Sequence, residues 1–64
     1  MKDKDYKKVK EGFMDIVNYA VMRREVAFCN GDGQTAKEMG HLVDIANDAF
    51  YTFREMVYKE ETDE

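Results

Sequence analysis

The sequence predicts an all-α protein, an antiparallel hairpin of two helices, and two observations support this fold class. The chain of 64 residues contains no proline, so no residue in it forces a break inside a helix. Two stretches with helical spacing of apolar residues flank one polar break near the middle, Asn30-Gly31-Asp32-Gly33. Because a short link makes two helices antiparallel neighbours, residues whose numbers sum to about 64 are expected at the same level.

The first helix is expected over residues 3–29, with Asp3 or Asp5 capping its first turn. Its end at Asn30-Gly31 suits a helix C-terminus, with Gly31 in the left-handed conformation. At about 100° per residue, eight apolar side chains fall on one stripe that is expected to face the second helix. This stripe consists of Tyr6, Val9, Phe13, Ile16, Val17, Ala20, Ala27 and Phe28.

The second helix is expected over residues 36–60, after a loop at 30–35 and before an acidic tail at 61–64. Thr35 and Glu38 fit a capping box, in which each side chain accepts a hydrogen bond from the backbone amide of the other residue. Alanines on both helices predict a close approach near the middle, with larger side chains filling the open end. The second stripe consists of Met39, Leu42, Val43, Ala46, Ala49, Phe50, Phe53 and Val57.

A single hairpin is expected to leave each stripe only half covered. Ordering a chain costs about 1.5 kcal/mol per residue, and about 25 cal/mol per Å² of buried apolar surface must offset that cost. One seam between two helices supplies too little burial for this. The chain, one domain over residues 1–64, is therefore expected to dimerise into an antiparallel four-helix bundle.

Composition excludes several classes of function. A net charge of −4 argues against general affinity for nucleic acid or anionic membranes. The single cysteine, Cys29, cannot form an intramolecular disulfide and suggests a reducing compartment. No apolar run reaches the roughly 18 residues of a membrane span, and the charged start MKDKDYKK is not a signal peptide. We therefore expect a cytoplasmic protein.

A second apolar seam lies on the first helix, roughly opposite its main stripe. Its residues follow a spacing of three, four and three, and it is predicted to be a self-association interface or, alternatively, a surface for a foreign partner. Arg24 lies near the centre of the main stripe, where it must reach water or a carboxylate. Glu38 of the second helix is expected at the level of Arg24, where a polar contact between the two side chains would set the register of the helices. The second seam consists of Tyr19, Met22, Val26 and Cys29.

Lysines crowd the first ten residues, but acidic residues interrupt them and their helical angles scatter around the helix. We expect them to pair across the hairpin with acidic residues near the C-terminus. The architecture resembles that of the plasmid copy-number regulator Rop, a hairpin of nearly this length that dimerises and binds RNA. That resemblance implies an alternative function in RNA or DNA binding by the first helix, and it transfers no binding residue. The two clusters are Lys2, Lys4, Lys7, Lys8 and Lys10, and Glu55, Glu60, Glu61, Asp63 and Glu64.

Patterns for metal binding and catalysis are weak. Glu38-x-x-His41 has the spacing found in di-iron bundles, but His41 lies on the outer side and the first helix has no inward-facing glutamate. The glycine-containing break lacks the ligands of a calcium loop and the lysine of a phosphate loop. Cys29 and His41 are more than two helical turns apart. No enzyme activity, metal or cofactor is expected.

The sequence therefore favours a non-enzymatic protein–protein interaction module. Small acidic proteins of this build are frequent among phage and plasmid proteins that inhibit or regulate a host or defence protein. An acidic face with Asp44, Asp48 and Glu55 could imitate a phosphate backbone. The nucleic-acid-binding regulator remains one alternative, and a purely structural oligomeric subunit is another.

Overall fold

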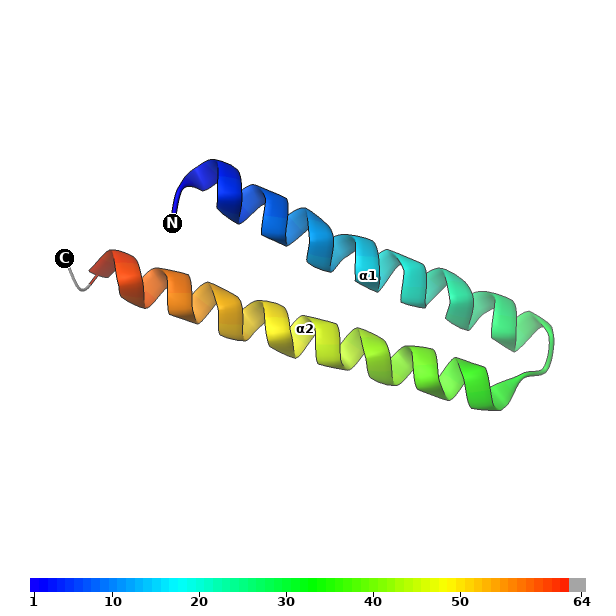
Figure 1. Cartoon of the computed structure of the whole chain (residues 1–64). Coiled ribbons are helices and arrows are strands. Elements are labelled where there is room, and N and C mark those ends of the chain that lie inside the picture. The colour runs from blue at the N-terminus through cyan, green and yellow to red at the C-terminus, as the bar shows by residue number, and fades with distance from the viewer. Residues whose placement is uncertain (63–64) are drawn as a thin grey trace.

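The computed structural model describes residues 1–62, which form two long antiparallel helices joined by a tight turn (Figure 1). α1 spans Asp3–Cys29 and α2 spans Gly33–Thr62. The Cα atoms extend over 52 × 18 × 8 Å, so the two helices lie in a single layer. The predicted helical hairpin is confirmed, while its dimerisation stays a prediction.

The turn satisfies the last backbone groups of α1. The Gly31 amide donates to the Phe28 carbonyl oxygen at 3.2 Å. The Asp32 amide donates to the Ala27 carbonyl oxygen at 2.8 Å, which completes the pair of bonds in a Schellman motif. Gly31 has a φ of 72°, a left-handed conformation that glycine adopts without steric cost. The predicted conformation of Gly31 is confirmed.

Asp32 also caps the start of α2. Its two carboxylate oxygens accept hydrogen bonds from the Thr35 amide at 3.1 Å and the Thr35 hydroxyl at 2.6 Å. Its carbonyl oxygen accepts from the Ala36 amide at 3.1 Å. The predicted capping box of Thr35 and Glu38 is therefore wrong, and the Glu38 carboxylate instead accepts from the Gln34 side chain at 3.0 Å.

This cap changes the bounds of α2. The helix begins at Gly33 rather than Ala36, which shortens the loop to residues 30–32. It continues to Thr62, past its predicted end, and the last part of the predicted acidic tail, residues 63–64, lies outside the described residues.

At the other end of the chain, α1 begins where the sequence predicts, but without the predicted cap. Lys2 occupies the N-cap position and no side chain caps the helix there. Asp3 and Asp5 lie in the first turn instead, where their charges favour the positive end of the helix dipole.

The interior is a narrow seam between the helices. Four of the five buried residues in the described part of the chain are alanines, which lets the helix backbones lie close together. The buried and half-buried residues of α2 include a run in which successive members are alternately three and four positions apart, the spacing of a helix that packs along one partner. The buried residues are Ala20, Ala27, Ala36, Ala46 and Val57.

Aromatic rings fill the open end of the hairpin, as predicted. The Tyr6 and Phe53 rings stack with centroids 5.8 Å apart and planes at 16°. Phe13 contacts Phe50 with centroids 5.5 Å apart and planes at 59°. The Phe13–Phe50 pair lies at the level that the antiparallel register predicts, whereas Phe53 lies about five residues before the position that this register places opposite Tyr6. All four side chains remain half-buried, because a layer of two helices cannot enclose a ring on every side.

Three residues of the predicted stripes are wrongly placed. Ile16 and Ala49 are exposed, and Phe28 is 65% exposed. Val21, which the stripe of the first helix omitted, is half-buried, and so is Arg24, which the sequence places near the centre of that stripe. The reason is geometric, because one neighbouring helix covers a narrower arc than the full apolar stripe of an amphipathic helix.

Candidate functional site

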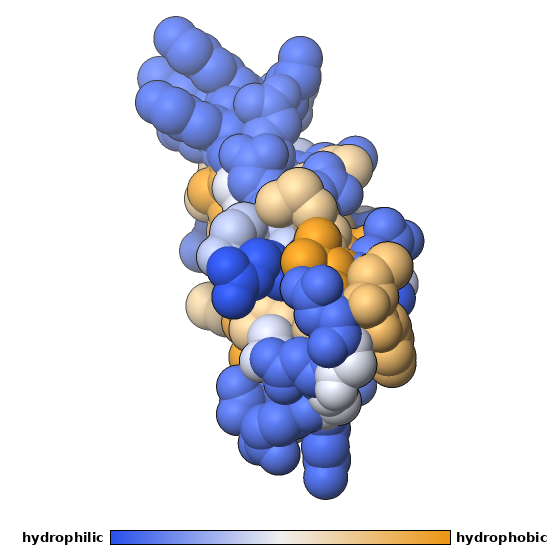
Figure 2. Space-filling model, turned by 90° about the vertical axis from the view of Figure 1, so that its right-hand side faces the viewer, coloured by the Kyte–Doolittle hydropathy of each residue, from blue (hydrophilic) through white to orange (hydrophobic). Residues whose placement is uncertain are grey.

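Two helices in one layer leave two broad faces and two outer edges. Viewed from the loop end, hydrophilic residues occupy the top and bottom of the molecule, while apolar residues gather in the band between them, with some hydrophilic residues among them (Figure 2). We name the broad faces from the helical positions of their residues. The aliphatic face carries Val9, Ile16, Tyr19, Val26, Leu42, Ile45, Ala49 and Met56, and the mixed face carries Met14, Val21, Phe28, Asn47, Tyr51, Arg54 and Tyr58.

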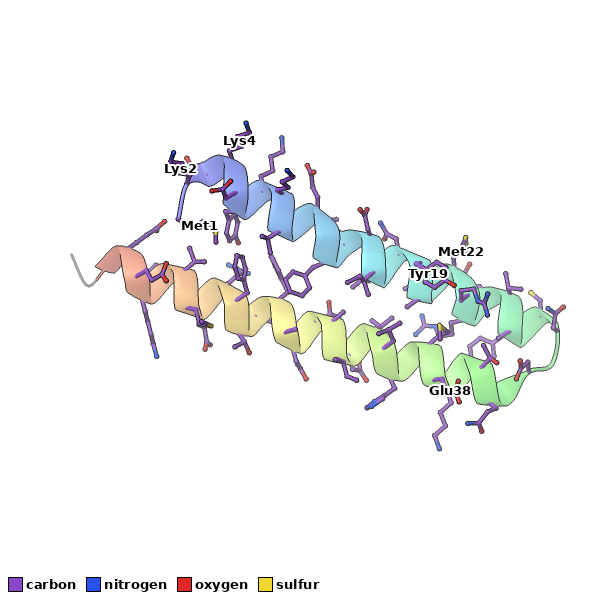
Figure 3. The ribbon with its side chains drawn as sticks, viewed as in Figure 1. Met1, Lys2, Lys4, Tyr19, Met22 and Glu38 are labelled. Carbon is purple, nitrogen blue, oxygen red and sulfur yellow. The ribbon has the colours of Figure 1, made fainter. Side chains whose placement is uncertain are left out.

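The structure divides the predicted second seam of α1 between two surfaces. All four of its side chains are exposed. Tyr19 and Val26 lie at the rim of the aliphatic face, whereas Met22 and Cys29 lie on the outer edge of α1. Figure 3 shows Met22 pointing away from α2. The Arg23 guanidinium lies 5.9 Å from the centre of the Tyr19 ring, so this rim already has a cationic neighbour.

Arg24 is half-buried at the seam, but it does not pair with Glu38 in the described part of the chain. Its side chain passes over Gly40, where a Cβ atom built on the glycine would lie 4.0 Å from Arg24 Cδ. Among the described residues, every buried side-chain nitrogen or oxygen has a hydrogen-bond partner. Because the Arg24 guanidinium forms no hydrogen bond to these residues, its nitrogens are not buried and contact water. The aliphatic stem of Arg24 therefore lies over Gly40 at this level of the hairpin.

The acidic face predicted for the second helix is an exposed strip on the outer edge of α2. Asp48 follows Asp44 by one turn, and Glu55 follows Asp48 by two turns, so all three lie on one side. The Thr52 hydroxyl donates to the Asp48 backbone carbonyl oxygen at 3.0 Å and not to the Asp48 carboxylate.

The lysines of α1 stand apart from the acidic end of α2. Figure 3 shows Lys2 and Lys4 pointing away from α2. Within residues 1–62, none of the five N-terminal lysines forms an ion pair. The predicted pairing with Glu55, Glu60 and Glu61 is absent there, and the predicted pairing with Asp63 and Glu64 lies outside the described residues.

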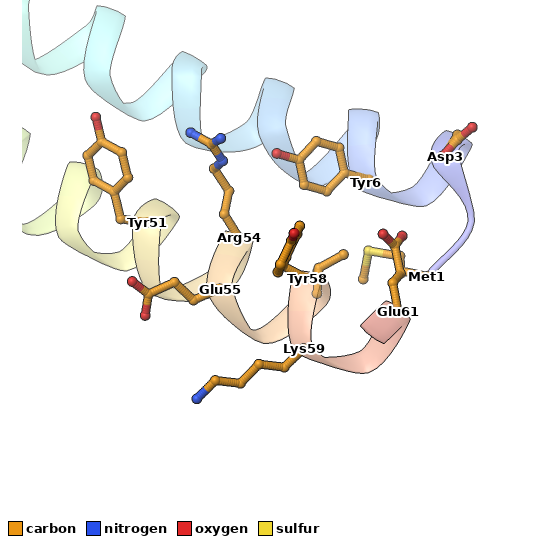
Figure 4. A pocket seen from close by; sticks show the side chains of 10 residues that line it. Met1, Asp3, Tyr6, Tyr51, Arg54, Glu55, Tyr58, Lys59 and Glu61 are labelled. Carbon is orange, nitrogen blue, oxygen red and sulfur yellow. The ribbon is translucent and has the colours of Figure 1, made fainter. Parts of the chain in front are cut away.

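A cleft of about 700 Å³ opens at the end opposite the turn, on the side of the mixed face (Figure 4). Its size lies within the usual range of small-molecule sites, about 300–1,000 Å³. Three tyrosines contribute to its wall. The sequence analysis did not predict this cleft, because its residues come from both ends of the chain and no local pattern connects them. The lining consists of Met1, Asp3, Tyr6, Tyr51, Arg54, Glu55, Val57, Tyr58, Lys59 and Glu61.

The arrangement offers little for metal binding or proton transfer. Among the described residues no group of three or more His, Cys, Asp or Glu side chains could hold a metal ion. Cys29 is a free, exposed thiol and His41 is exposed. Hydrogen bonds from the Thr35 hydroxyl and amide lower the pKa of Asp32, with help from the Arg23 charge, but this carboxylate serves as a helix cap.

None of the described helices is both long enough and apolar enough to cross a membrane. Comparisons with protein-family models, with curated proteins and with solved structures found no match to this chain. The fold is an αα-hairpin, a class that does not itself define an activity. Any functional conclusion must therefore come from its surfaces.

Proposed function

We propose that this chain is a non-enzymatic protein–protein interaction module, a homodimer that acts on another protein as a small inhibitor or regulator of the phage or plasmid type. One observation carries the proposal. The chain exposes 5311 Å² of surface, whereas a compact monomer of its mass would expose about 4,200 Å². The excess includes exposed large apolar side chains on both broad faces, and such surface is typical of interaction sites.

The outer edge of α2 suits a basic partner. Asp44, Asp48 and Glu55 are exposed on one side of a rigid helix and span about 16 Å, at a rise of about 1.5 Å per residue. A row of carboxylates on a protein of net charge −4 attracts a cationic groove and can occupy a nucleic-acid site by imitating its phosphates. We therefore assign recognition of the partner to this strip.

A second candidate is a regulator that binds RNA or DNA through α1. The observation that favours it is the set of N-terminal lysines, which are exposed and form no ion pairs within the described residues. Binding through lysine–phosphate contacts would weaken steeply with added salt. A third candidate, a purely structural subunit, requires self-association and no further partner.

Affinity capture from a lysate of the host cell, with and without nuclease, tests these functions. Two triple variants are compared, and each removes three charges. The acidic variant combines Asp44→Asn, Asp48→Asn and Glu55→Gln. The lysine variant combines Lys4→Gln, Lys7→Gln and Lys8→Gln. We expect the wild type to capture a nuclease-insensitive protein that the acidic variant loses and the lysine variant retains. Capture that depends on nucleic acid and on the lysines would support the second candidate. Self-association with no captured protein would support the third.

A further inference from the structure

The two broad faces differ in chemistry. The aliphatic face carries aliphatic side chains from both helices, among them Val9, Ile16, Leu42 and Ile45. The charged residues among them, such as Arg23 and Glu38, are fewer than those on the mixed face. The mixed face interrupts its apolar residues with groups such as Asn47 and Arg54, and Arg54 is already placed 6.0 Å from the centre of the Phe50 ring. Burying the aliphatic face therefore desolvates fewer polar groups, each of which is costly to bury without a partner.

The exposed surface has the area that a dimer interface needs. The excess over a compact monomer is about 1,100 Å² per chain by the scaling of surface with mass. A stable complex buries about 800 Å² on each partner. A hairpin layer of 52 × 18 Å offers one face of sufficient size, so a second copy packed on one face accounts for the excess without using the other.

The helical stripes of the sequence point to the same face. Ile16 and Ala49 belong to these stripes by periodicity but are exposed in the hairpin, and both lie on the aliphatic face. In a four-helix bundle each helix contacts a neighbour on two sides, so its apolar stripe extends from the hairpin seam around to the face that meets the second layer.

Small and large residues alternate on this face in a way that suits interlocking. Ala49 is small and exposed, and a Cβ atom built on the nearby Gly12 would have no other atom within 4 Å. Projecting side chains of a second copy, such as Ile45 and Met56, can enter such hollows. The charges near the face have both signs, with Arg23 on α1 and Glu38 on α2, so the face has no concentration of one sign that would repel a second copy.

We propose that a second copy of this chain docks on the aliphatic face, which leaves the mixed face and the outer edge of α2 free for the partner protein. The dimer is a layer-on-layer four-helix bundle with a self-complementary interface. The statement that the remaining surfaces serve a partner protein rests on the proposed function. The docking of two copies can be tested without any partner.

Three methionines with nearly equal exposure make a matched test. Met56 on the aliphatic face is 60% exposed, Met14 on the mixed face 52% and Met22 on the outer edge of α1 56%. Each is changed to glutamate, with Ile45→Glu as a more central variant on the aliphatic face. Sedimentation equilibrium of the full chain then measures the dissociation constant of the dimer.

We expect a dimeric wild type. Met56→Glu and Ile45→Glu should raise the dissociation constant at least about 30-fold, the effect of losing a central interface contact. Met14→Glu and Met22→Glu should leave it within about threefold of the wild type, because exposed positions outside an interface contribute little. A monomeric wild type, or a dimer weakened by Met14→Glu but not by Ile45→Glu, would overturn the proposal.

A second measurement covers the case in which Ile45→Glu prevents folding. In a Cys29→Ala background, single Ile45→Cys and Met14→Cys variants are treated with a thiol reagent under dimeric conditions. The thiol at position 45 should react at least about tenfold more slowly, because covered sites react only after local or global opening. Equal rates would contradict docking on this face. The dissociation constants and the thiol reaction rates are both measured without lysate capture. An error in the dimer interface can therefore be distinguished from an error in the assignment of the partner surface.

Discussion

The loop end and the open end of the hairpin are held together by different physics. At the loop end, backbone hydrogen bonds of the turn pair carbonyl oxygens at the end of α1, and the Asp32 side chain pairs an amide at the start of α2. Buried alanines bring the two helices together there. At the open end the contacts are between aromatic side chains far apart in sequence, and all of them are half-buried. Local chemistry therefore fixes one end, while long-range packing fixes the other.

This difference teaches where the hairpin is vulnerable. Half-buried aromatic contacts depend on the whole helix lengths staying in register, and the open cleft lies at the same end. The turn depends only on a few consecutive residues. Substitutions at the open end are therefore expected to have larger effects on stability than substitutions in the turn.

The largest effect is expected from Phe53→Ala, which removes ring contacts with Tyr6 and Phe13 at the open end. We expect a loss of about 2–4 kcal/mol in the free energy of unfolding, at or below the usual range for a fully buried phenylalanine because the ring is half-exposed. Urea denaturation at constant chain concentration measures it. The control Tyr51→Ala removes an exposed ring, 60% accessible, and should be nearly neutral. Equal losses in the two variants would show that the aromatic cluster does not hold the open end.

A smaller loss is expected from Ala46→Leu, in the part of the seam where alanines bring the helices close. Ala46 is 5% exposed, so the larger side chain should force the helices apart at a cost of about 1–3 kcal/mol. Ala49→Leu, one turn away and exposed, should not disturb the seam within one hairpin. Thermal unfolding of both variants compares them at a chain concentration below the dissociation constant of the dimer, because Ala49 lies on the proposed dimer interface. If Ala49→Leu is the more damaging, the seam of α2 has been assigned to the wrong side.

At the turn, Gly31→Ala should cost about 1 kcal/mol, because a Cβ atom is strained at a left-handed φ of 72°. Gly33→Ala is the matched control, since Gly33 is the first residue of α2, has no positive φ and has nothing within 4 Å of an added Cβ. Its effect should be neutral or stabilising. The change in melting temperature of each variant measures these effects. If Gly31→Ala leaves the melting temperature unchanged, the turn must relax to another conformation.

The smallest effect concerns the charge of Asp32. Hydrogen bonds from Thr35 lower its pKa in the folded chain, so the ionised form stabilises the fold above the unfolded-state pKa, near 3.9. That stabilisation is lost as the pH falls through the lower, folded-state pKa. Asp32→Asn retains a good N-cap without the charge. The difference in melting temperature between wild type and Asp32→Asn should therefore shrink below about pH 4, and a difference that is constant with pH would show that the charge has no role.

The sequence by itself determined the helices, their antiparallel order and the left-handed turn at Gly31. Helical periodicity and a single glycine-containing break are local signals, and no proline or strand pattern competes with them. The sequence also placed Phe13, Ala20, Ala46 and Phe53 on the facing sides, because their spacing follows the helical repeat.

Only the tertiary structure decided the finer points. Asp32 and Thr35 are both acceptable caps in sequence, and the turn geometry selects Asp32 because its amide already completes the end of α1. Arg24 reaches water over Gly40 instead of pairing with Glu38, since glycine leaves space for the arginine stem. The exposure of Ile16 and Ala49 follows from the narrow contact between two helices, a property of the assembled layer that periodicity along one helix does not contain.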